Sequence, residues 1–197
     1  GFIEDMAAAI ASLPRQLSQL NIAAASPLNI ILMGHSAGAH SAAILAANPS
    51  YLTKANARVN VSGFIGLAGP YDLPLDDPLV IGKFDSIELH PMVKEQPHNR
   101  HDANPINLAQ STMPNTLLIH GAKDITVGPY HSDNFKERLD QLKVACEYVV
   151  YEKADHRTLV GALSIYGRFL NPVYADIARY LKTHNKDEES LKPMKKA

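Results

Sequence analysis

Hydrophobic residues recur along the chain with two spacings, one typical of helices and one of buried strands. Over residues 3–20 they recur at three- and four-residue steps, which predicts an amphipathic helix that Pro14 kinks or splits. Residues 28–33 form a short, nearly continuous apolar run, as expected of a parallel strand buried on both faces. The alanine-rich stretch 36–47 predicts a helix packed closely on a sheet.

The same alternation continues toward the C-terminus. Strands separated by helices imply parallel βαβ units, so the expected fold class is α/β, with a doubly wound and mostly parallel sheet. The final helix is expected to have Asn171 as its cap and Pro172 at its first position. Further strands are expected at residues 61–67, 115–119 and 146–151, and a helix at Phe135, Leu139 and Leu142.

One domain accounts for most of the chain. A length of 197 residues with 46% hydrophobic residues is ordinary for a single globular domain, expected here over residues 1–185. Residues 70–112 hold many prolines, aspartates and histidines with little periodicity, which predicts a long, lid-like insertion. Residues 186–197 are charged and lack aromatic side chains, so they are expected to form a disordered polar tail.

Composition narrows the possible partners. A net charge of -1, from 19 basic and 20 acidic residues, favours neither nucleic acid nor an anionic membrane. No apolar run approaches the roughly 20 residues of a membrane span. The single cysteine, Cys146, excludes an internal disulfide and is expected to be buried; it fits a cytosolic protein without proving that location. Because the chain starts with Gly1 rather than Met, a processed or truncated N-terminus is expected, and localisation and oligomeric state stay open.

The sequence Gly34-His35-Ser36-Ala37-Gly38 contains the pattern G-x-S-x-G between the first predicted strand and the alanine-rich helix. A serine hydroxyl is a poor nucleophile, and a sharp strand-to-helix turn would project Ser36 above the sheet in a strained backbone conformation. Gly34 and Gly38 would keep side chains out of the tight strand–helix contact. The N–H of Ala37 could donate to a developing oxyanion. The alternative is a Gly/Ser turn that only caps the helix.

An acid and a base are expected to follow this serine in chain order. Asp124 and His156 each follow a predicted strand, at the carboxyl end where active-site groups of α/β sheets gather. His156 would take the proton of Ser36 and return it to the leaving group, while Asp124 orients the imidazole. The alternatives are a solvated turn aspartate and a surface histidine. Asp72 is expected to organise its own turn because its strand comes too early, and Asp155 ranks below Asp124.

Other histidines carry weaker signals. His98, His101 and Asp102 crowd together inside the insertion, where a metal clip is conceivable. No second ligand cluster or zinc-type spacing accompanies them, so a solvated loop is expected, and neither a metal nor a cofactor is implied. His40 lies one helical turn after Ser36 and is expected to pack or cap the helix.

Four segments stand in order along the chain: Gly34-His-Ser-Ala-Gly-Ala-His40, Gly66-Leu-Ala-Gly-Pro-Tyr-Asp72, His120-Gly-Ala-Lys-Asp124 and Ala154-Asp-His156. With them the chain resembles the α/β-hydrolase esterase/lipase family, in particular its small bacterial carboxylesterase and kynurenine formamidase-like branch. The resemblance implies the C-terminal part of an α/β-hydrolase fold and an acyl-enzyme mechanism with a Ser36 nucleophile, an Asp124 acid and a His156 base. Family members also carry an upstream strand and a His-Gly-Gly type loop that supplies further oxyanion donors, and no such segment stands in this chain.

The expected activity is hydrolysis of a small-molecule carboxylic ester, with a small or medium acyl group, through an acyl-serine intermediate. Residues 70–112 would shape its pocket. Within the enzymes, an aryl-formamidase or a serine peptidase of the same fold is the alternative. Outside them, the alternative is a non-catalytic fragment or binding domain that retains the serine turn as scaffold.

Overall fold

A parallel four-stranded sheet forms the centre of the structure, a computed structural model that describes residues 1–74 and 101–190, with side chains up to residue 184. The strands follow one another across the sheet in chain order, and all three neighbouring pairs are parallel. The strands are β1 (Leu28–His35), β2 (Val59–Leu67), β3 (Asn115–Gly121) and β4 (Cys146–Tyr151). Each contains the apolar run that predicted it.

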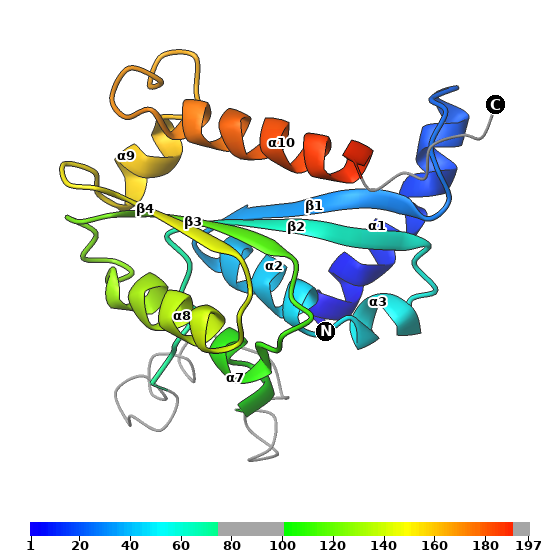
Figure 1. Ribbon diagram of the computed structural model, residues 1–197, viewed down its shortest axis with the longest axis horizontal. Coiled ribbons are helices and arrows are strands. Elements are labelled where there is room, and N and C mark those ends of the chain that lie inside the picture. Colours follow the sequence, from blue (N-terminus) through cyan, green and yellow to red (C-terminus); the bar gives the residue numbers. More distant parts are fainter. Residues whose placement is uncertain (75–100, 191–197) are drawn as a thin grey trace.

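Helices cover both faces of this sheet (Figure 1), so the doubly wound α/β class is confirmed. On one face lie α9 (His156–Gly161) and α10 (Val173–Ser190). On the other lie α2 (Ala37–Ala47), α7 (Pro105–Leu108) and α8 (Tyr130–Gln141). Helices α1 (Phe2–Gln19) and α3 (Ser50–Lys54) pack outside α2, where Ile3, Ile44 and Leu52 share a cluster.

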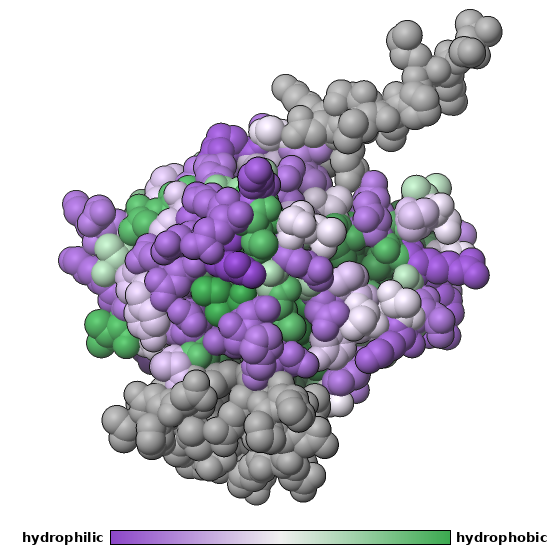
Figure 2. All heavy atoms as spheres, turned by 60° about the horizontal axis from the view of Figure 1, so that its bottom comes forward, coloured by the Kyte–Doolittle hydropathy of each residue, from purple (hydrophilic) through white to green (hydrophobic). Residues whose placement is uncertain are grey.

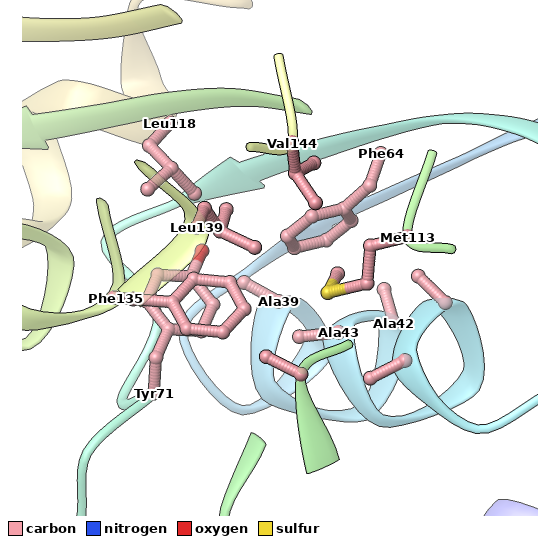
Figure 3. Close-up of a cluster of buried hydrophobic side chains, with 13 residues drawn as sticks. Ala39, Ala42, Ala43, Phe64, Tyr71, Met113, Leu118, Phe135, Leu139 and Val144 are labelled. Carbon is pink, nitrogen blue, oxygen red and sulfur yellow. The ribbon is translucent and has the colours of Figure 1, made fainter. Parts of the chain in front are cut away.

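The two faces receive alternate side chains from the central strands, as the strand period requires. Phe64 of β2 and Leu118 of β3 point toward α2 and α8, where they meet Ala39 and Phe135 (Figure 3). Their chain neighbours point the other way, into a cluster with α9 and α10 made of Ile65, Leu67, Leu117, Ile119, Leu159, Val173 and Ile177. The sheet therefore has a hydrophobic core on each side.

The burial predicted for the first strand is wrong. β1 lies at one edge of the described sheet, beside β2 alone, and its residues are half-buried or exposed. Met33, for example, is 45% exposed. The strands buried on both faces are β3 and the second half of β2, because each has a neighbour on both sides and helices above and below.

Both terminal helices differ from their predictions. α1 continues through Pro14 as one helix and is not split in two. α10 begins at Val173, one residue after the predicted start, and continues to Ser190, so the first part of the predicted disordered tail is helical. The rest of that tail, and residues 75–100 of the predicted insertion, lie outside the described residues.

The described end of the insertion packs on the body of the protein. Asn104 is buried and exchanges two hydrogen bonds with the backbone of Leu73. His40 of α2 donates from Nε2 to the carbonyl of Ala103, 2.8 Å away, which agrees with the packing role expected for it. Ala109 lies in the core beneath α2 and α8.

The outer surface is mixed in character. Hydrophilic side chains cover much of the face shown in Figure 2, with hydrophobic side chains in patches between them. Within residues 1–74 and 101–190, none of the helices combines the length and the apolar character needed to cross a membrane.

Candidate active site

Ser36 occupies the turn between β1 and α2 with an unusual backbone conformation. Its φ is 55° and its ψ is -125°, a region that residues other than glycine rarely adopt. The Ser36 N–H donates to the carbonyl of Leu67 at 2.9 Å and so ties the turn to the end of β2. The structure therefore has the strained strand-to-helix turn that the G-x-S-x-G pattern predicts.

The two glycines of this turn differ in importance. A Cβ on Gly34 would lie 2.3 Å from the backbone of Gly38, so position 34 has no room for a side chain. The same role predicted for Gly38 is wrong for the described structure. There, a Cβ on Gly38 would meet no described atom within 4 Å.

The N–H of Ala37 is open at the start of α2. The carbonyl of Ser36 accepts from the N–H groups of Ala39 and His40, further along the first turn of the helix. Within the part of the chain that the structure describes, no acceptor pairs with the Ala37 N–H itself. Such a free donor at a helix N-terminus favours negative charge.

Asp124 is a carboxylate with no exposed side-chain surface. Its Oδ1 accepts from the N–H groups of Thr126 and Val127, both at 2.9 Å. Its Oδ2 accepts from Nδ1 of His156 at 2.7 Å. Three hydrogen bonds offset the cost of burying this charge, and they aim Oδ2 at the imidazole.

His156 is the first residue of α9, and its side chain is 14% exposed. An ionised Asp124 can only accept, so the proton of a neutral His156 sits on Nδ1. Nε2 is then an unprotonated acceptor. A ring with this tautomer is ready to take a proton from a hydroxyl group.

The turns that carry Asp124 and His156 are bound to each other. The N–H of Ala122 donates to the carbonyl of Tyr151, and the N–H of Lys123 donates to the carbonyl of Ala154, both at 3.0 Å. A Cβ on Gly121 would lie 2.4 Å from that Ala154 oxygen, so the approach needs a glycine. Backbone packing thus fixes the spacing of the two side chains.

The other two candidate carboxylates have different partners. The Asp155 side chain caps α9 by accepting from the N–H groups of Arg157 and Thr158. Asp72 accepts from Asn134 at 2.7 Å, and its N–H donates to Nδ1 of His131 at 3.2 Å. Among the described residues, Asp124 is the carboxylate that contacts His156.

His35, the residue before Ser36, contacts His156 at the start of α9. Nε2 of His35 lies 3.0 Å from the carbonyl oxygen of His156, and the two ring centroids are 4.6 Å apart. Within the described residues, Ser36 Oγ itself forms no hydrogen bond with His156. The structure brings all three predicted residues to the carboxyl edge of the sheet, and it joins two of them by a direct side-chain contact.

A shallow hollow opens to the surface beside the imidazole of His156. Its volume is about 250 Å³. It is lined by Ile125, Thr126, Asp155, His156 and Arg157. Ile125 is almost fully exposed at its rim.

Two further buried histidines lie near the site, His120 beside Asp124 and His131 beside Asp72, although their sequence positions carried no usable signal. His120 is fully buried, accepts from Ser132 Oγ at 2.7 Å and donates from Nε2 to the carbonyl of Val127 at 2.9 Å. It thereby holds the turn that supplies two donors to Asp124. Burial lowers the pKa of His120 and lowers the pKa of His131 to about 4, so both rings are neutral near pH 7.

The histidine cluster of the insertion shows a different environment. His101 and Asp102 are exposed and contact each other at 3.3 Å. His98 lies outside the described residues. Nowhere in the described ranges do three or more histidine, cysteine, aspartate or glutamate side chains group as a metal site would require.

Solved structures share this architecture. The chain aligns with a truncated carbohydrate esterase from gut microbiota (TM-score 0.69, 19% identity), with 93% of this chain and 68% of that one covered. It also aligns with a carboxylesterase of Lactobacillus plantarum (TM-score 0.63, 19% identity), covering 93% of this chain and 67% of that one. A thermophilic esterase of Thermogutta terrifontis gives a TM-score of 0.66 at 18% identity, over 98% and 66% of the two chains.

Sequence comparison adds a curated relative and a family model. The chain is 25% identical over 170 residues to the probable isoprenylcysteine alpha-carbonyl methylesterase ICMEL2 of Arabidopsis thaliana. That match covers 76% of this chain but spans only 40% of the plant protein. The BD-FAE family model matches residues 1–139, which is more than half of the chain. The chain therefore belongs to the BD-FAE family of α/β-hydrolases.

Proposed function

We propose that this protein hydrolyses carboxylic esters through an acyl-serine intermediate, with Ser36 as nucleophile, His156 as general base and Asp124 as the orienting acid. The observation that carries this proposal is the 2.7 Å hydrogen bond from His156 Nδ1 to the buried Asp124 carboxylate, at the same sheet edge as the strained Ser36 turn. The names of the matched proteins, a methylesterase and several esterases, favour an ester over an amide substrate.

The chemistry follows from the proton positions. Ser36 Oγ attacks the carbonyl carbon while its proton passes to Nε2 of His156, and Asp124 stabilises the resulting imidazolium. The Ala37 N–H donates to the oxyanion of the tetrahedral intermediate. His156 then returns the proton to the departing alcohol, which leaves an acyl-Ser36.

A water molecule completes the cycle by the same route. His156 Nε2 takes one proton from the water as its oxygen attacks the acyl-enzyme, and the proton then passes to Ser36 Oγ as the acid leaves. Acylation and deacylation both need Ser36 Oγ and His156 Nε2 within hydrogen-bond distance of each other in the substrate complex. Contacts of this kind are often long in ligand-free enzymes.

Activity-based labelling tests the nucleophile directly in the intact protein. A fluorophosphonate probe should label the wild type at Ser36, and Ser36→Ala should remove both the label and the turnover of p-nitrophenyl acetate, with kcat at least about 1,000-fold lower. Ser62→Ala is the matched control, because Ser62 Oγ only donates to the carbonyl of Ile30 on the neighbouring strand. Undiminished labelling and turnover in Ser36→Ala would refute the proposed nucleophile.

The substrate class is tested by comparing rates. Turnover of p-nitrophenyl acetate should exceed that of N-formylkynurenine and of a peptide anilide when each is expressed as kcat/KM. A higher rate on N-formylkynurenine would assign an aryl-formamidase, and a higher rate on the anilide would assign a peptidase. Absence of Ser36-dependent turnover on all three would favour a non-catalytic domain that keeps the turn as scaffold.

A further inference from the structure

His35 connects the nucleophile turn to the helix that carries the base. It is the last residue of β1 and directly precedes Ser36, whereas its side-chain partner, the carbonyl of His156, lies 121 residues further along the chain. A carbonyl oxygen only accepts, so His35 Nε2 carries the proton of this 3.0 Å hydrogen bond. The two imidazole rings lie against each other with centroids 4.6 Å apart.

This hydrogen bond gives His156 a second fixed point. Asp124 holds its ring at Nδ1, which determines how the ring is rotated. His35 holds its main-chain carbonyl, which determines how far the start of α9 lies from the end of β1. With both points held, Nε2 of His156 has no hydrogen-bond partner among the described residues and so remains available as an acceptor.

The charge of His35 is also constrained by its surroundings. Burial first, and the nearby His156 second, lower the pKa of His35, while the more distant His120 of β3 acts in the same direction. The His156 carbonyl and Asp124 act in the opposite direction. A neutral His35 avoids placing a second positive charge against the imidazolium that forms on His156 in each chemical step.

We propose that His35 is a positioning residue that sets the distance between His156 and Ser36 by donating Nε2–H to the His156 carbonyl. This inference rests on the proposed ester hydrolysis. A base displaced by about 1 Å can cost about 100-fold in rate, so the clamp should affect the chemical step more than substrate binding. A side chain that keeps the donor should keep the clamp.

Two substitutions distinguish the effect of the Nε2–H donor of His35 from the effect of the volume of its ring. His35→Phe fills similar space without a donor, and its kcat on p-nitrophenyl acetate should fall about 10- to 100-fold with KM changed less than about threefold. His35→Gln places an amide N–H near the same carbonyl, and it should retain kcat within about threefold of the wild type. Hydrogen exchange of the α9 amides should rise in His35→Phe and stay near the wild-type rate in His35→Gln.

Tyr180→Phe serves as the matched control. Tyr180 Oη donates to the carbonyl of Asn115 at 2.6 Å, which is also a side-chain link to backbone but lies at the opposite end of β3 from Asp124. Urea unfolding should show lower stability for this control with kcat unchanged. A comparable loss of kcat in the control would show a general effect of lost stability and would overturn the positioning role.

The kinetics distinguish failure of the positioning role from failure of the proposed function. If wild-type turnover depends on Ser36 but His35→Phe and His35→Gln have the same kcat, the positioning role alone is overturned. If wild-type turnover does not depend on Ser36, the proposed function is overturned, and the role of His35 falls with it.

Discussion

The carboxylate of Asp124 has no contact with solvent, yet both of its oxygens accept hydrogen bonds. Two backbone N–H groups hold Oδ1, and the imidazole of His156 holds Oδ2. Nε2 of His120 lies 3.5 Å from the same Oδ2 atom. Such an arrangement selects one tautomer of a neutral His156 ring, and a substitution that preserves the shape of Asp124 but not its two acceptor oxygens therefore tests it.

Asp124→Asn should lower kcat on p-nitrophenyl acetate by about 1,000- to 10,000-fold with the fold retained. The amide nitrogen would face His156 Nδ1–H and favour the other tautomer, whose Nε2 is protonated and cannot act as a base. Steady-state kinetics, with circular dichroism to verify folding, measures this.

Asp72→Asn is the comparison variant, because Asp72 is bonded to Asn134 and His131 and not to His156. It should keep kcat within about threefold of the wild type. A large loss at Asp72 with little loss at Asp124 would show that the acid had been wrongly assigned.

At the scale of elements, the site depends on where helices begin. α2 begins directly after Ser36, and α9 begins at His156, held by the capping box of Asp155 and Thr158. Each helix therefore presents its first turn at the carboxyl edge of the sheet. The packing beneath α9 then decides how firmly the imidazole is placed.

Leu159→Ala should impair catalysis as well as stability. Leu159 is the fully buried residue of α9, and its truncation should lower the free energy of unfolding by about 2–5 kcal/mol. Because α9 carries His156, the kcat of the folded enzyme should also fall, by about threefold or more. Urea unfolding and kinetics on the same samples measure both effects.

Leu139→Ala provides the equivalent cavity elsewhere. Leu139 is equally buried, but it belongs to α8, which packs on the opposite face of the sheet. Its cost in stability should be similar, with kcat nearly unchanged. Equal loss of kcat in both variants would mean that α9 has no special part in placing the base.

For the whole molecule, buried neutral histidines make stability depend on pH. Burial is the main cause that lowers the pKa of His35, His40, His120 and His131. Below pH 6.5 the unfolded chain binds protons at these rings before the folded one does, so the free energy of unfolding falls as the pH falls. The stability is fully present above pH 6.5 and is lost progressively below it.

His131 gives the window in which this can be measured. Its pKa shifts from 6.5 when unfolded to about 4 when folded, so acidification from pH 7 to pH 4 should cost on the order of 3 kcal/mol through this ring. His131→Asn keeps an acceptor for the N–H of Asp72 but does not titrate. Urea unfolding between pH 7 and pH 4.5 should show a shallower loss of stability in this variant, and identical slopes would contradict the assignment.

The sequence by itself determined the four strands, the main helices between and after them, and the positions of Ser36, Asp124 and His156 at strand ends, but not the short helices α3, α7 and α9. These are local properties, since hydrophobic spacing and the glycine-flanked serine are visible within a few residues. The choice of Asp124 over Asp72 as the partner of His156 also followed from chain order, and the contact geometry agrees with it.

Only the tertiary structure decided the rest. That β1 lies at an edge of the described sheet, that Gly38 is sterically free, and that His35 and His120 bind the carbonyls of His156 and Val127 all depend on how the segments pack in the folded chain. A single histidine in a sequence has no periodic signal, because its role is set by the carbonyl or hydroxyl that it meets after folding. Such partners are chosen by packing, which no short stretch of sequence specifies.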